Sequence, residues 1–174
     1  MNIRVLIILA LLVGMGAVLH IITPPLLFGM KPDMVLCMMF LGILLFPKIQ
    51  YVLLVSIASG IVAALTTAVP GGQISNIIDK PITGLIFFAL VLLIGDKMNK
   101  NISSPILAAI GTLVSGVVFL TVALYIVGLL EGAFTSLFVV VVLPAVVMNI
   151  ILMAIIYPIA QSIMKRSSQS FSIT

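Results

Sequence analysis

Apolar residues occupy this chain in long blocks that are separated by short breaks rich in polar residues, glycine or proline. A helix that crosses the hydrocarbon core of a membrane needs about 20 apolar residues. Six blocks approach this length, and we expect each of them to form a membrane-spanning helix. They are residues 5–22, 34–46, 51–68, 82–95, 105–128 and 137–159.

Two of these blocks, 34–46 and 82–95, are short for a span. They cross only if flanking residues also lie within the membrane or if the bilayer thins locally. The first block follows Arg4 as a signal peptide would, but no small-x-small cleavage pattern comes after it, so we expect an uncleaved span. The pattern predicts an all-α integral membrane protein with a single domain, a bundle of six transmembrane helices.

Composition supports lipid as the solvent. Of the 174 residues, 63% are hydrophobic and 7% are charged, whereas soluble domains carry about 25% charged residues. With the N-terminus in the cytoplasm, six basic residues lie on the cytoplasmic side and only Lys31 and Lys80 on the outer side. Membrane proteins typically carry such an excess of lysine and arginine in their cytoplasmic loops. The net charge of +4 therefore indicates topology rather than a nucleic-acid partner, and both termini are expected in the cytoplasm. The six inner residues are Arg4, Lys48, Lys97, Lys100, Lys165 and Arg166.

The longest polar break is residues 71–81, Gly-Gly-Gln-Ile-Ser-Asn-Ile-Ile-Asp-Lys-Pro. We expect it to be an outer loop that caps a small-molecule site, because its carboxylate, ammonium and amide groups complement a small zwitterion. Alternatively, such charges reach lipid headgroups or neutralise one another. The candidate binding residues on the outer side are Lys31, Asp33, Gln73, Asn76, Asp79, Lys80 and Glu131.

Asn149 lies near the middle of the last block, where an unpaired amide is costly. Two interpretations remain open: a hydrogen bond between helices, or the floor of the same pocket. The lone His20 has no evident base or metal partner, so we expect a headgroup contact. Gly111 and Ser115 in the fifth block form a small-residue stripe that favours close helix packing.

Motifs of enzymes are missing from the sequence. It contains no His-Glu-x-x-His, no Gly-x-Ser-x-Gly and no Gly-Lys-Ser/Thr, and Cys37 is its single cysteine. We therefore expect a protein that is not an enzyme and that holds no metal or cofactor of its own. Uphill transport would then draw on an ion gradient or on another subunit. Because Asn149 cannot titrate and is the one polar group expected deep in the membrane, an ion gradient is disfavoured.

Several segments resemble the bacterial tryptophan transporter family, and the likeness extends over most of the chain. They include Gly16-Ala17-Val18-Leu19-His20, Phe28-Gly29-Met30-Lys31-Pro32-Asp33-Met34, Asn76-Ile77-Ile78-Asp79-Lys80-Pro81 and Val141-Val142-Leu143-Pro144-Ala145. The family in turn looks like the substrate-binding (S) components of energy-coupling-factor (ECF) importers. That resemblance implies a six-helix fold and three kinds of partner: a nutrient, a transmembrane coupling subunit and two ATPases that hold ATP.

The resemblance implies uptake of L-tryptophan across the bacterial cell membrane. The resemblance supplies no individual contacts, and from the residues themselves we expect the ligand ammonium to meet Asp79 or Glu131 and its carboxylate to meet Lys80 or Lys31. The amides of Asn76 and Asn149 would assist. In S components the first helix presents small residues to the coupling subunit, and Ala10 and Gly14 fit that pattern. The alternatives are a stand-alone secondary tryptophan transporter and a structural membrane subunit without a ligand.

Overall fold

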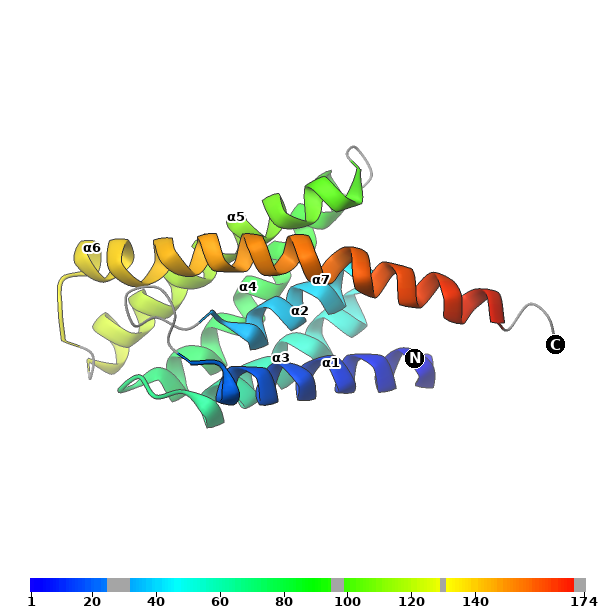
Figure 1. Ribbon diagram of the computed structural model, residues 1–174. Helices are drawn as coiled ribbons and strands as arrows, with labels where there is room; N and C mark the ends of the chain where they lie inside the picture. The colour runs from blue at the N-terminus through cyan, green and yellow to red at the C-terminus, as the bar shows by residue number, and fades with distance from the viewer. Residues whose placement is uncertain (25–31, 95–98, 129–130, 171–174) are drawn as a thin grey trace.

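The computed structural model describes residues 1–24, 32–94, 99–128 and 131–170, and in this part of the chain all regular structure is helical. Figure 1 shows the helices packed side by side, with the start of α1 and the end of α7 at the same end of the bundle. The all-α prediction is confirmed. The elements are α1 (Ile3–Ile22), α2 (Met34–Leu45), α3 (Ile49–Thr66), α4 (Gly72–Ile94), α5 (Lys100–Thr121), η2 (Val122–Val127), α6 (Phe134–Leu137), η3 (Phe138–Val142) and α7 (Leu143–Ser170).

Helix α2 is the centre of the bundle. It contacts α1, α3, α4, α5 and α7, and every residue from Met34 to Ile43 is buried. A helix that is apolar all round belongs in an interior. Its 12 residues extend about 18 Å at 1.5 Å per residue, which is less than the roughly 30 Å thickness of the hydrocarbon core. The neighbouring helices, rather than lipid, therefore cover most of α2.

Five other helical stretches are long and apolar enough to cross a membrane. Helix α5 continues directly into the π-helical segment η2, and α6, η3 and α7 form one uninterrupted stretch. Large apolar side chains such as Leu11, Leu65 and Ile151 point away from the bundle and are exposed. Such an apolar outer surface suits lipid and would be a liability in water.

Helix α4 differs from its expected form, because it begins at Gly72 rather than at residue 82. The expectation of an outer loop over residues 71–81 is therefore wrong. Gly71, with φ 72°, makes the turn that precedes the helix, and Pro81 lies inside the helix instead of at its start. The side chains of Ser75 and Asn76 donate to the carbonyls of Gly71 and Gly72, one turn earlier. These bonds give the buried hydroxyl of Ser75 and the buried amide of Asn76 partners within the bundle.

Small residues allow the helices around α2 to approach closely. Beside Gly60 on α3, the backbone of Asn76 on α4 is so near that an added Cβ would lie 3.1 Å from its carbonyl oxygen. Gly111 on α5 faces Phe40 and Phe87, whose rings are stacked with centroids 4.0 Å apart. Close packing at small residues is a general means of holding helices together in lipid.

Gly111→Ala tests this packing. Its new methyl group would lie 2.6 Å from Phe40 Cζ and 2.8 Å from Phe87 Cδ2, and both rings are fully buried. We expect a loss of about 1–3 kcal/mol in unfolding free energy from overpacking, although alanine is the better helix former. Gly14→Ala is the matched control, because a Cβ there meets nothing within 4 Å. In detergent, the midpoint of thermal unfolding should be lower for Gly111→Ala than for the wild type and unchanged for Gly14→Ala. Equal midpoints for the two variants would contradict this packing.

Candidate functional site

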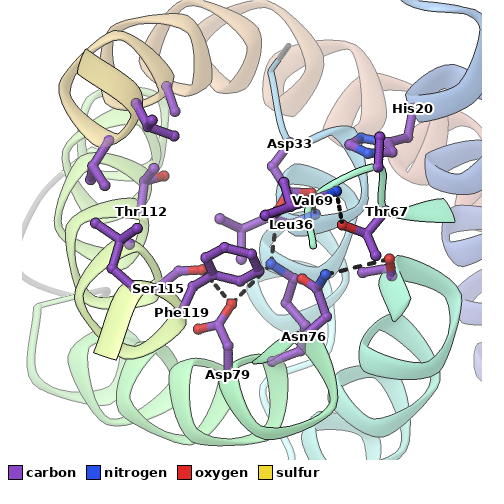
Figure 2. A pocket seen from close by; sticks show the side chains of 18 residues that line it. His20, Asp33, Leu36, Thr67, Val69, Asn76, Asp79, Thr112, Ser115 and Phe119 are labelled. Atoms are coloured by element: carbon purple, nitrogen blue, oxygen red, sulfur yellow. Dashed lines mark hydrogen bonds and ion pairs between the residues drawn. The ribbon is translucent and has the colours of Figure 1, made fainter. Parts of the chain in front are cut away.

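A cavity of about 350 Å³ opens among α2, α3, α4, α5 and the η3–α7 stretch. Its lining includes His20 of α1, Thr67 at the end of α3 and Asn76 near the start of α4. These helix ends lie at the end of the bundle opposite the start of α1 and the end of α7 (Figure 1). Its volume falls in the range of about 300–1,000 Å³ that is usual for small-molecule sites. Figure 2 shows Thr112 and Ser115 on one side, Asp33, Thr67 and His20 on the other, and Asp79 and Asn76 between them.

A buried cluster of three charged groups forms the polar end of the cavity. Lys80 Nζ donates to Asp33 Oδ2 at 2.7 Å and to Asp79 Oδ2 at 3.0 Å. The exposed fraction of the side chain is 1% for Lys80, 0% for Asp79 and 28% for Asp33. With all three groups ionised, two carboxylates face one ammonium, so the cluster carries one excess negative charge.

Local structure holds each carboxylate in place. Asp33 is the N-cap of α2, and its Oδ1 accepts the Leu36 N–H at 2.9 Å while Oδ2 faces Lys80. Asp79 Oδ1 accepts from the Thr83 hydroxyl at 2.7 Å, and Oδ2 accepts from Ser115 on α5 at 2.6 Å. The cluster thus joins α2, α4 and α5 through hydrogen bonds that position both carboxylates.

The opposite side of the cavity is apolar. Its lining residues come from α5, η3 and α7, and they are Phe119, Leu120, Val141, Val142 and Ala145. The charged groups and this apolar wall line the same cavity, so the cavity complements a molecule that carries charge at one end and an apolar ring at the other.

Four of the residues predicted from the sequence meet in this cavity: Asp33, Asn76, Asp79 and Lys80. Asn76 uses its amide nitrogen within the protein, since Nδ2 donates to Gly72 O at 2.9 Å and to Ala63 O at 3.4 Å. These bonds tie the start of α4 to α3.

The other predicted residues lie elsewhere. Gln73 and Glu131 are exposed and do not line the cavity, and Lys31 lies outside the described residues. Asn149 is fully buried, and its Nδ2 donates to Thr112 Oγ1 at 3.1 Å. It therefore makes an interhelical bond and, through Thr112, also stands directly behind the cavity wall.

Sequence reasoning missed several residues that line the cavity or hold the groups lining it. Ser115 was expected only to aid packing, yet it binds Asp79, and Thr112 and Thr83 were not singled out. His20 was expected at lipid headgroups, but it lines the cavity, with Nδ1 buried and without a partner in the described part of the chain. A usable signal was present: Thr112 and Ser115 are three apart and so share a helix face.

Comparisons with known proteins show which family the chain belongs to. A model of the tryptophan transporter TrpP family matches residues 2–165. The chain belongs to this family. It is 56% identical over 168 residues to a probable tryptophan transport protein of Bacillus subtilis, covering 97% of this chain and 96% of the relative. A protein with the same description from Clostridium acetobutylicum is 45% identical over 157 residues, covering 90% and 91%.

A third relative of that description, from Clostridium perfringens, is 38% identical over 176 residues, with 96% of each chain covered. No solved structure matches this chain. The resemblance to the tryptophan transporter family is confirmed, and this family is one of transporters rather than enzymes. Together with the membrane-spanning helices, it makes this chain a multi-pass membrane protein.

Lys80→Met tests the charged cluster. Removing the ammonium leaves two carboxylates facing each other in a buried space, and we expect a loss of about 3–5 kcal/mol in unfolding free energy. The double variant Asp33→Asn/Lys80→Met removes one carboxylate as well and should recover part of that loss. Lys48→Met is the matched control, because Lys48 is exposed at the other end of the bundle. Thermal unfolding in detergent measures all three; a double variant no more stable than Lys80→Met would contradict the pairing.

Proposed function

We propose that this chain binds L-tryptophan in the cavity and carries it across the bacterial cell membrane. One observation carries the proposal: the Asp33–Lys80–Asp79 cluster and an apolar wall line the same cavity. The relatives described as probable tryptophan transport proteins support the choice of amino acid.

The chemistry of the cluster allows an amino acid to be oriented. Asp33 and Asp79 attract the ligand ammonium. An ammonium has three donors, and Lys80 directs two of them to these carboxylates, which leaves one for the ligand carboxylate. The indole then lies against Phe119 and Leu120. In this arrangement the roles considered for Glu131 and Lys31 pass to Asp33 and Lys80.

Binding of tryptophan to the purified chain tests the proposal. The chain contains no tryptophan, so the fluorescence of the ligand indole can be followed without interference from protein indole, and its emission should move to shorter wavelength in the apolar cavity. Asp79→Asn should weaken binding by about tenfold or more, because it removes a charge partner of the ligand ammonium. Gln73→Ala and Glu131→Gln should bind as the wild type does. Absence of binding by the wild-type chain would favour a structural subunit instead.

We further infer that the chain acts as the S component of an ECF-type importer. Helix α1 turns Ala10 and Gly14 outward, and a Cβ at Gly14 would meet nothing within 4 Å. These exposed small residues offer a place where a helix of a coupling subunit could approach closely, with ATP held by two partner ATPases. The basic ends of the helices, at Arg4, Lys48 and Lys100, lie opposite the cavity and support cytoplasmic termini and a cavity open to the outside.

A second candidate is a transporter driven by an ion gradient. The sequence offered no titratable group deep in the membrane, yet Asp79 and Lys80 lie buried within α4. A zwitterion adds no net charge, so the excess negative charge of the cluster persists when tryptophan binds. A proton or cation that moves with the ligand would neutralise it, and desolvation makes such neutralisation favourable.

Uptake by intact cells separates the two energy sources. If partner ATPases supply the energy, uptake of labelled tryptophan should continue when an uncoupler is added and ATP is held constant. Gly14→Leu should then abolish uptake while leaving binding unchanged, because a large side chain blocks close helix approach. Uptake that collapses with the uncoupler, and survives Gly14→Leu, would instead support the ion-driven candidate.

A further inference from the structure

The carboxylate of a bound amino acid needs more hydrogen-bond donors than Lys80 supplies. The two oxygens of a carboxylate accept about four hydrogen bonds between them. Lys80 has one N–H left after it has donated to Asp33 and Asp79. The cluster of these three groups also carries an excess negative charge, which repels a further carboxylate. An amino acid that binds at this end of the cavity therefore requires additional donors beside the cluster.

Several polar side chains that line the cavity have already used their protons within the protein. Ser115 donates its hydroxyl proton to Asp79. The amide nitrogen of Asn76 donates to two backbone carbonyls, and the Thr112 hydroxyl donates to a third. A hydroxyl has one proton and an amide nitrogen has two, so these three side chains have no proton left for a ligand carboxylate.

His20 and Thr67 are lining side chains that still have a proton to donate. The half-buried His20 has no hydrogen bond to another described residue, and its Nδ1 is enclosed, which leaves Nε2 as the nitrogen for a ligand. Thr67 is also half-buried, and its Oγ1 accepts the Val69 N–H at 3.2 Å. Accepting a bond leaves the hydroxyl proton of Thr67 free, and no other described residue takes it.

These two donors lie beside Asp33. His20 is in the last turn of α1 and Thr67 is the C-cap of α3, and the two helices are in contact. Figure 2 shows both side chains on the same side of the cavity as Asp33, and His20 is close enough to interact electrostatically with the Asp33 carboxylate. In an amino acid one carbon carries both the ammonium and the carboxylate, so donors for the carboxylate must lie next to acceptors for the ammonium. His20 and Thr67 meet this condition.

We propose that His20 Nε2 and the Thr67 hydroxyl donate to the carboxylate of the bound amino acid, while Asp33 and Asp79 hold its ammonium. This inference rests on the proposed binding of tryptophan and names residues that would distinguish an amino acid from the corresponding amine. A site built to hydrogen-bond one group of its ligand discriminates against an analogue that lacks the group.

Tryptophan and tryptamine together test the proposal. Tryptamine retains the indole and the ammonium but lacks the carboxylate, and the fluorescence of either ligand can be followed because the chain contains no tryptophan. His20→Ala should weaken the binding of tryptophan about tenfold and that of tryptamine less than about twofold, because only tryptophan loses a hydrogen bond to its carboxylate. Thr67→Val should also weaken the binding of tryptophan selectively, by about threefold or more.

Each variant has a control on its own helix. Thr66→Val is matched to Thr67→Val, because the Thr66 hydroxyl donates to Val62 O at 2.9 Å and the residue does not line the cavity. Gly14→Ala is the control on α1 for His20→Ala, since a Cβ at Gly14 meets nothing within 4 Å. Both controls should bind tryptophan and tryptamine as the wild type does.

The measured quantity is the ratio of the affinities for tryptophan and tryptamine. A ratio that stays at the wild-type value in both His20→Ala and Thr67→Val would overturn the proposal, and a change in one variant alone would overturn the role of the other residue. If one variant fails to fold, the other decides, because the two residues lie on different helices. If the wild-type chain binds neither ligand, the proposed function itself is wrong. Binding of both ligands with unchanged ratios would leave tryptophan as ligand and remove only the contacts to its carboxylate.

Discussion

The rest of the structure depends on one buried ammonium group. Lys80 has almost no exposed surface and lies between the carboxylates of Asp33 and Asp79. An unpaired charge in such a place would be very costly, so the start of α2, the third turn of α4 and Ser115 of α5 must meet where they do. The same requirement fixes the polar end of the cavity. If the proposed ligand binds at this end, stability and ligand recognition depend on the same groups, so a substitution there would affect both.

Different helices supply the charged part and the apolar part of the cavity wall. Helix α4 and the N-cap of α2 supply its charged groups, whereas α5, η3 and α7 supply the apolar wall. Val141 and Val142 of that wall belong to the π-helical segment η3, and Leu120 lies just before the π-helical segment η2. Single wide turns of this kind occur often at functional sites because they displace the side chains that follow. Here they occur on the two stretches that face the charged cluster, so the irregular geometry coincides with the place where a ring would lie.

Much of the fold follows from hydrophobic length alone. The blocks near α1, α2 and α3 were located within a few residues, since a helix in lipid or in a bundle core needs only a continuous apolar run. The start of α4 was missed because Pro81 is equally suited to the first turn of a helix and was taken as one. The buried positions Gly72, Asn76, Asp79 and Thr83 repeat every three or four residues, so a helical face was present in the sequence. Because this face carries polar residues, a search for long apolar runs did not detect it.

Local patterns in the sequence could not predict which side chains pair across the bundle. Asp33 and Lys80 are 47 positions apart, and Ser115 and Asp79 are 36 apart, so neither contact leaves a periodic trace in the sequence. Counted along the chain, Asp79 and Lys80 look like neighbours that cancel each other. In space Lys80 also meets Asp33, and the cluster retains a negative charge that no other described side chain within it removes. A cluster of purely structural ion pairs has no need of that excess, because burying it opposes folding. The imbalance is a physical argument for the proposal that a positively charged group binds here, either the ammonium of a ligand or a proton or cation that accompanies it.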